Sequence, residues 1–334
     1  MKQAIDTLRA KLPALEQAWR QLRQWRPRRR YRQRWAGADL QAGALHIIVL
    51  DPGKPGEKVR VLECKTLPLE TPLSAEMLAG HAQALDSHPQ QWSLLLERDD
   101  YRISILPAPA VPEDETIESL RWQLAPSLDF DADDAAIGCM ALPAAAQMTE
   151  RPAELYAVAA RGLRVAAHAL LFSTAQLPLR AIDIRETAQR NIAALMEREQ
   201  ELLVLVAFMH HEVQITFNWH GELYLDRLIA ESSSTDDAPE RQAALCDRIA
   251  LQVQRSLAAV RNSYPFMQAA RIVAAGAPPG FCDTLAHTVD AAVEALQPED
   301  FLDLALTPQL RAPEQLMRYF HALGSALRGR EDAA

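Results

Sequence analysis

Apolar and polar residues follow two different periods along this chain, and together these periods predict an α/β protein. Short apolar runs at 44–50 and 202–208 predict buried strands. A turn and an alternating apolar–polar stretch follow each run, up to residue 67 in one case and 229 in the other, as is typical of a half-buried strand that returns antiparallel. Because this pattern occurs twice, half a chain apart, it predicts two similar α/β lobes.

The remaining stretches predict further elements in each half. Ser74 is a typical N-cap and predicts a helix start. Expected strands lie at 92–96, 101–106, 135–142, 155–160, 179–184 and 271–275. Expected helices lie at 74–85, 113–126, 165–175, 243–260, 281–296 and 313–327.

The first 37 residues form a distinct basic arm. Apolar residues recur in it at steps of three and four, which predicts an amphipathic helix that Pro13 interrupts: Ile5, Leu8, Leu12, Leu15, Trp19 and Leu22. Residues 1–34 hold eleven Lys and Arg against two acids, although the whole chain has a net charge of -9. A basic arm on an acidic body indicates that the arm meets an anionic surface or the body itself.

The aromatic and arginine side chains of the arm suit the headgroup region of an anionic membrane. On this interpretation the membrane contacts are Trp19, Arg23, Trp25 and Arg26. Packing of the arm on the acidic body is an equally weighted alternative. A nucleic-acid-binding arm is another alternative, against which the acidic body and the absence of a known binding module argue, so no nucleic acid is expected.

Composition and motifs exclude several other classes of protein. No apolar run approaches the roughly 18 residues needed to cross a bilayer, and the arm lacks the apolar centre of a secretory signal. The four cysteines form no CxxC pair and the nine histidines no HExxH motif, so no metal site is expected. The chain also has no GxSxG, P-loop or GxGxxG motif.

Five stretches, taken in order, resemble the PilM family of actin-like proteins, and among them its MshI branch from mannose-sensitive haemagglutinin (MSHA) pilus assembly. The first carries a proline-spaced entry to a helix with an Arg-Trp pair, and the last closes with Ala-Leu-Arg. They are residues 106–123, 155–163 with 177–184, 221–229, 251–264 and 322–328.

The resemblance implies an actin-like (ribonuclease H-like) two-lobed fold preceded by the basic amphipathic arm. The arm would take residues 1–37 and the first lobe 38–190, with an inserted subdomain at about 107–161. The second lobe would take 191–334, with a C-terminal helix that returns towards the first lobe. The family's place is cytoplasmic and peripheral to the inner membrane.

Actin-like proteins hold ATP and Mg²⁺ between their lobes, and this chain keeps only part of that site. Asp51, Gly53 and Gly276 match the family's nucleotide residues, although Asp51 is equally well explained as a turn residue after a strand. Pro52 and Pro55 remove two backbone donors, and no carboxylate lies at 206–211, where the second loop should begin with Asp. We therefore expect no hydrolysis and at most weak Mg-ATP binding; an active actin-like ATPase of pilus or type II secretion assembly is the alternative.

The resemblance implies a platform for type IV pilus assembly that holds the cytoplasmic tail of a PilN-like inner-membrane protein. The assembly ATPase of the pilus machine is a further expected partner. The expected groove lies beside the inserted subdomain, with Val111, Ile117 and Leu120 as candidate lining residues. For each of these three, packing of the inserted helix on its own strands is the simpler alternative.

Overall fold

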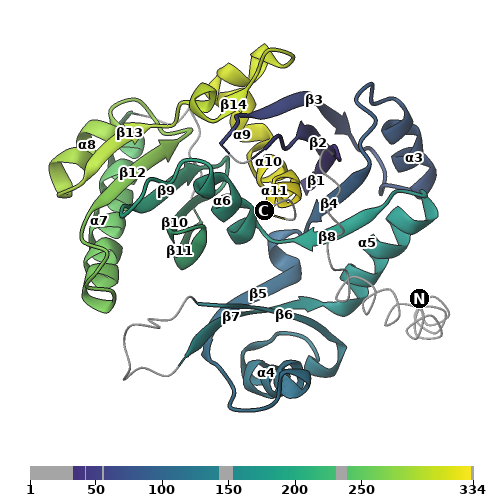
Figure 1. Ribbon diagram of the computed structural model, residues 1–334, viewed down its shortest axis with the longest axis horizontal. Helices are drawn as coiled ribbons and strands as arrows, with labels where there is room; N and C mark the ends of the chain where they lie inside the picture. The colour runs from purple at the N-terminus through teal and green to yellow at the C-terminus, as the bar shows by residue number, and fades with distance from the viewer. Residues whose placement is uncertain (1–32, 42, 55, 143–152, 231–238, 332–334) are drawn as a thin grey trace.

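The computed structural model describes residues 33–41, 43–54, 56–142, 153–230 and 239–331. It is an α/β structure with sheets of six, five and three strands (Figure 1). None of the helices in these ranges is long and apolar enough to cross a bilayer.

The six-stranded sheet forms the centre of the first lobe. Two helices, α3 (Ala75–Gln83) and α5 (Gly162–Thr174), cover one face through Leu78 and Phe172. The helix α10 (Phe320–Ala326) packs on the other face, against β1, β2 and β4. In spatial order the strands are β14 (Leu302–Asp303), β3 (Val59–Pro68), β2 (Ala44–Asp51), β1 (Trp35–Gln41), β4 (Gln91–Leu95) and β8 (Leu179–Asp183).

The five-stranded sheet forms the second lobe. Its outer face carries α7 (Pro239–Ser263) and α8 (Phe281–Thr288), whereas α6 (Arg185–Ala194) packs between this sheet and α10. In spatial order the strands are β11 (Glu222–Ile229), β10 (Val213–Trp219), β9 (Leu202–Phe208), β12 (Ala270–Ala275) and β13 (Ala292–Ala295).

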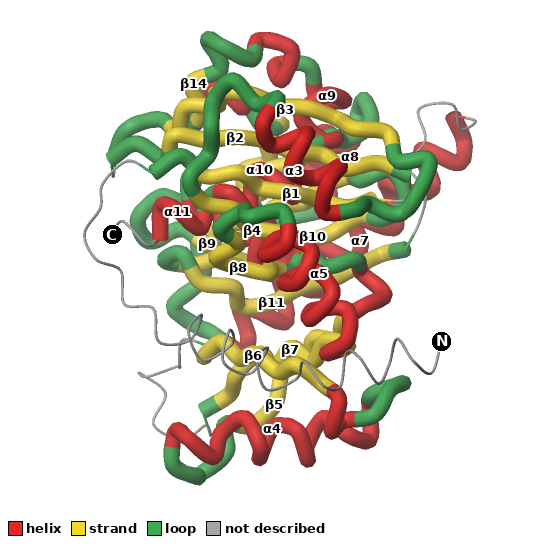
Figure 2. Tube along the Cα trace, turned by 90° about the vertical axis from the view of Figure 1, so that its right-hand side faces the viewer, coloured by secondary structure: helices red, strands yellow, loops and turns green. Residues whose placement is uncertain are grey.

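The three-stranded sheet forms a separate layer that Figure 2 shows at the lower end of the molecule. Its order is β5 (Tyr101–Pro107), β7 (Glu154–Arg161) and β6 (Ala135–Ala141), and α4 (Thr116–Leu124) covers one face. We call residues 101–161 the insert. It begins six residues before the boundary expected at 107, because β5 belongs to its sheet.

Three other predictions from the sequence need correction. The arm does not extend to Gly37, because β1 begins at Trp35, a side chain only 4% exposed. The helix expected over 281–296 ends at Thr288 and is followed by β13. The C-terminal helix expected over 313–327 is divided into α9 (Pro313–Arg318) and α10, and α11 (Arg328–Glu331) follows them.

Candidate functional site

The loop after β2 carries the first predicted nucleotide residues, and two of its backbone donors are bonded to carboxylates of the same loop. The N–H of Gly53 donates to the Asp51 carboxylate at 3.1 Å, and the N–H of Lys54 donates to the Glu57 carboxylate at 3.2 Å. Pro52 and Pro55 have no N–H to offer. A phosphate group that approached the N–H groups of Gly53 and Lys54 would therefore meet the carboxylates of Asp51 and Glu57.

The C-terminal helix α11 also closes on this loop. The Arg330 guanidinium donates to the carbonyl oxygens of Pro52 and Glu57, at 3.2 and 3.1 Å. These bonds tie Pro52 and Glu57 to α11. The Asp51 carboxylate accepts the N–H of Gly53 in its own loop, a hydrogen bond that is typical of a turn aspartate.

The second loop, between β9 and β10, lacks the expected aspartate and contains a carboxylate that the sequence analysis overlooked. Glu212 is 9% exposed and forms an ion pair with Arg185 at the start of α6. The N–H of Met209 is bonded to the carbonyl of Glu212 at 2.8 Å. The charge of Glu212 is therefore engaged by arginine, the opposite of what a Mg²⁺ site requires.

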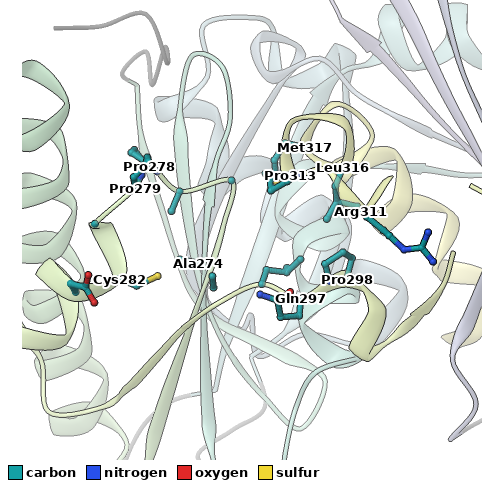
Figure 3. A pocket seen from close by; sticks show the side chains of 16 residues that line it. Ala274, Pro278, Pro279, Cys282, Gln297, Pro298, Arg311, Pro313, Leu316 and Met317 are labelled. Atoms are coloured by element: carbon teal, nitrogen blue, oxygen red, sulfur yellow. The ribbon is translucent and has the colours of Figure 1, made fainter. Parts of the chain in front are cut away.

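Gly276, the third predicted nucleotide residue, lines a pocket of about 310 Å³ (Figure 3). The pocket lies between the turn that leads into α8 and the segment 311–317. Gly276 has a φ of +64°, and a Cβ there would lie 2.9 Å from the Phe208 carbonyl oxygen and 2.6 Å from Cγ of Met317. The volume suits a small ligand, but Asp51 and Gly53 are not among the lining residues.

A buried polar cluster joins the first lobe, the second lobe and the insert. Glu186 on α6 is 1% exposed and accepts a hydrogen bond from the Tyr101 hydroxyl at 2.7 Å. The Arg98 guanidinium lies 3.8 Å from the same carboxylate. Tyr101 begins β5, so this cluster fixes the point where the insert leaves the first lobe.

The same cluster continues into the second lobe. The Gln214 amide donates to the Asp226 carboxylate at 3.1 Å, and its oxygen lies 3.1 Å from Nε2 of the buried His321. Since an amide oxygen can only accept, His321 carries its proton on Nε2. Burial lowers the pKa of His321 well below its usual value, and the nearby Arg185 lowers it further. His321 is therefore neutral at pH 7.

Burial raises the pKa of Asp226 to about 7, and the nearby Glu186 adds to the effect. An unfolded aspartate ionises near pH 3.9, so ionisation of Asp226 in the folded protein opposes folding increasingly from about pH 4 to pH 7. Asp226→Asn should therefore stabilise the protein more at pH 8 than at pH 5, by about 1–2 kcal/mol after allowance for solvent screening.

Urea unfolding at the two pH values would measure this difference. Asp247→Asn, on the exposed side of α7, controls for loss of a surface carboxylate from the same lobe. An Asp226→Asn effect of equal size at both pH values would contradict the prediction.

An ion pair between a buried carboxylate and a partly exposed arginine holds the C-terminal segment to the first lobe. Asp183, at the end of β8, is 2% exposed, and its Oδ2 accepts from Nε of Arg328 at 2.8 Å. Arg328 keeps the pKa of Asp183 below its usual value in spite of the burial that opposes this, and Thr187 adds a hydrogen bond. Arg328 lies in the closing Ala-Leu-Arg of the resemblance, but the sequence did not indicate its partner.

The candidate partner-binding residues of the insert lie in different surroundings. Leu120 is fully buried in the core of the insert, and Ile117 packs against that core, so both support α4 on its own sheet. The prediction that Leu120 lines a groove is therefore wrong. Val111 is 38% exposed and Ile105, on the outer strand β5, is 40% exposed.

The predicted membrane contacts lie outside the described residues. Trp19, Arg23, Trp25 and Arg26, the predicted membrane contacts, all fall within 1–32. Within the described ranges, no group of three or more His, Cys, Asp or Glu side chains is placed to hold a metal ion.

Comparison with known proteins identifies the fold. No family model and no curated protein sequence matches the chain. Among solved structures, the PilM-PilN type IV pilus biogenesis complex is similar at 17% identity and a TM-score of 0.60, covering 90% of this chain and 99% of that one. The cytoplasmic domain of EpsL, an inner-membrane component of the type II secretion system of Vibrio cholerae, gives 12% identity and a TM-score of 0.46, over 87% and 95%.

A Bacteroides thetaiotaomicron protein with an actin-like ATPase fold gives 11% identity and a TM-score of 0.43, over 84% and 97% of the two chains. The α/β architecture and the likeness over nine-tenths of the chain identify an actin-like fold. The fold class predicted from the sequence is confirmed.

Proposed function

We propose that this protein is a non-hydrolysing platform for assembly of a type IV pilus of the MSHA kind, and that it binds the cytoplasmic tail of a PilN-like inner-membrane protein. The observation that carries the proposal is the likeness to the PilM-PilN complex, which extends over 90% of this chain. The five sequence stretches that resemble the PilM family support it. On this proposal the protein works at the cytoplasmic face of the inner membrane.

The insert offers an edge where an extended peptide could bind. β5 is an outer strand of its sheet and pairs with β7 along one side. A peptide added to the other side would gain main-chain hydrogen bonds, and its alternate side chains would contact the apolar surface at Ile105. The buried cluster of Tyr101, Glu186 and Arg98 holds the start of β5 in place.

A peptide with the sequence of the PilN-like tail should bind the full chain with micromolar affinity, about -8 kcal/mol. Fluorescence anisotropy of the labelled peptide would measure it. Ile105→Asp should weaken binding about tenfold or more, because it places a charge in the apolar contact. Leu306→Asp makes the same kind of change at an exposed leucine, 63% exposed and outside the insert, and should leave the affinity unchanged.

Binding should also survive removal of residues 1–32, which precede the first lobe. If the intact chain does not bind the peptide, the proposed function is wrong. If it binds and Ile105→Asp has no effect, the peptide lies elsewhere on the protein.

Mg-ATP should not be hydrolysed, and calorimetric titration should give at most weak binding. The reasons are the engaged donors of the first loop and the Arg185-bound Glu212 of the second. Loss of one well-placed catalytic group commonly lowers a rate about 10²–10³-fold, and several are absent here. Low-micromolar affinity that is lost in Asp51→Ala would contradict this prediction.

A further inference from the structure

Helix α5 has an exposed apolar stripe on the side that faces away from the first sheet. Leu163 is 44% exposed and Leu170 is 38% exposed, and the exposed Ala167 lies between them. Steps of four and three residues place all three on one face of the helix. The opposite face, with Val165 and Phe172, is buried.

The described chain begins beside the C-terminal end of this helix. The Gln33 side chain accepts a hydrogen bond from Gln91 at 2.8 Å, and the Arg34 guanidinium donates to the Ser87 carbonyl at 2.6 Å. The next residue of β4, Trp92, donates its N–H to the carbonyl of Pro178, four residues after α5 ends. Residues 1–32 therefore join the body where the stripe ends.

The N-terminal end of α5 lies against an acidic segment of the insert. A Cβ on Gly162, the first residue of α5, would lie 2.2 Å from the carbonyl oxygen of Asp134. Asp131, Asp133 and Asp134 are exposed there. Residues 113–134 contain eight carboxylates and a single basic residue, Arg121.

Residues 1–32 contain apolar side chains that match the stripe of α5 and basic side chains that match the acidic segment. Their apolar residues recur at helical steps from Ile5 to Leu22, and ten Lys and Arg stand among them against two acids. The thirteen residues of α5 span about 20 Å, and 32 residues reach about 48 Å even if wholly helical. The segment is thus long enough to run the length of α5 and to meet the acidic end.

We propose that residues 1–32 fold back along α5 of the same molecule. Their apolar side chains cover Leu163, Ala167 and Leu170, and their basic side chains meet the carboxylates at 131–134. The occupant of this surface is therefore the chain's own N-terminal segment. Two observations indicate this: the charges of the segment and of residues 131–134 are complementary, and the segment is attached beside α5. The proposal is independent of whether the insert binds a PilN-like tail.

Zero-length carbodiimide cross-linking of the full chain tests this contact, since the reagent joins a lysine to a carboxylate in direct contact. The chain has five lysines, of which Lys2 and Lys11 lie in the N-terminal segment. Mass spectrometry should find Lys2 or Lys11 joined to a carboxylate within 129–134. In a mixture of ¹⁴N- and ¹⁵N-labelled protein, these products should each carry a single isotope, as expected for a contact within one molecule.

The double variant Leu163→Ser/Leu170→Ser should lower the yield of these products about tenfold, because it removes the apolar contact. Leu251→Ser on α7 removes a leucine of similar exposure, 40%, and should not change the yield. Mixed-isotope products would assign the surface to a second copy and overturn the proposal. Equal yields in the Leu163→Ser/Leu170→Ser and Leu251→Ser variants would also overturn the proposal. The same holds if no product forms and the full chain instead sediments with anionic vesicles, provided that this sedimentation requires residues 1–32.

Discussion

Arg328→Ala should destabilise the protein by about 3–5 kcal/mol, because it leaves the carboxylate of Asp183 buried without its counter-ion. Asp183 is 2% exposed and lies at the end of β8, next to the start of α6. Its remaining partners are the hydroxyl of Thr187 and the N–H of Ile184. Neither carries the positive charge that offsets the desolvation of the carboxylate. Urea unfolding at pH 7 would measure the loss.

Arg60→Ala is the matched control, because it breaks an arginine–aspartate pair of similar length, 2.9 Å, at the surface. The Arg60 side chain is 58% exposed, and such pairs contribute at most about 1 kcal/mol.

The folded-state pKa of Asp183 is lowered, so the stability it supplies is present above the unfolded pKa and is lost as pH falls through the folded one. Without Arg328, burial raises the pKa of Asp183, so the difference between wild type and Arg328→Ala should be largest at pH 7 and should shrink as the pH falls through the raised pKa of Asp183 in the variant. Equal effects of the two variants at pH 7 would show that the buried pair has no special role.

Sequence patterns predicted most of the two lobes because their central strands are apolar and follow regular periods. The runs at 44–50 and 202–208 became β2 and β9, each paired antiparallel with the next strand. The strand β1 was missed because its residues include Ala36, Gly37, Ala38 and Asp39 in place of branched side chains. Of these, Gly37 is required because α10 packs closely on β1: a Cβ at Gly37 would lie 1.9 Å from the carbonyl oxygen of Ala322, a tertiary contact that no local pattern contains.

The insert boundary and the helix at 281–296 were misjudged for related reasons. The apolar residues of 289–295 fit a helical period as well as a strand, and β13 is defined by its parallel pairing with β12. Likewise, Tyr101 looked like part of a strand of the first lobe, whereas β5 pairs with β7, more than fifty residues later. Pairing between distant segments decided both elements.

Of the candidate site, the sequence predicted only which nucleotide-binding groups are missing. The prolines of the first loop and the missing aspartate of the second are visible in the sequence. The side chains that hydrogen-bond to the remaining polar atoms of the site are distant in the sequence or belong to the opposite lobe. Arg330 reaches the loop at Pro52, and Arg328 reaches Asp183 across 145 positions. Such partners become apparent only when the fold brings α11 beside β2 and β8.

The close packing of α10 between β1 and α6 leads to the last prediction, which is that Gly324→Ala should destabilise the protein by about 3 kcal/mol or more. A Cβ at Gly324 would lie 2.0 Å from the carbonyl oxygen and 2.5 Å from the carbonyl carbon of Ala188 on α6. These are backbone atoms, so a rotamer change cannot relieve the contact, and the two helices would have to separate. That separation would also stretch the hydrogen bond from the Asn191 amide to the Gly324 carbonyl, now 2.9 Å.

Gly80→Ala is the matched control, because Gly80 is an exposed helical glycine of α3 with nothing within 4 Å of the added Cβ. Helix propensity alone should make that change neutral or stabilising by up to about 1 kcal/mol. Thermal unfolding of the two variants would compare them, and a Gly324→Ala protein as stable as Gly80→Ala would show that α6 and α10 are not in this close contact.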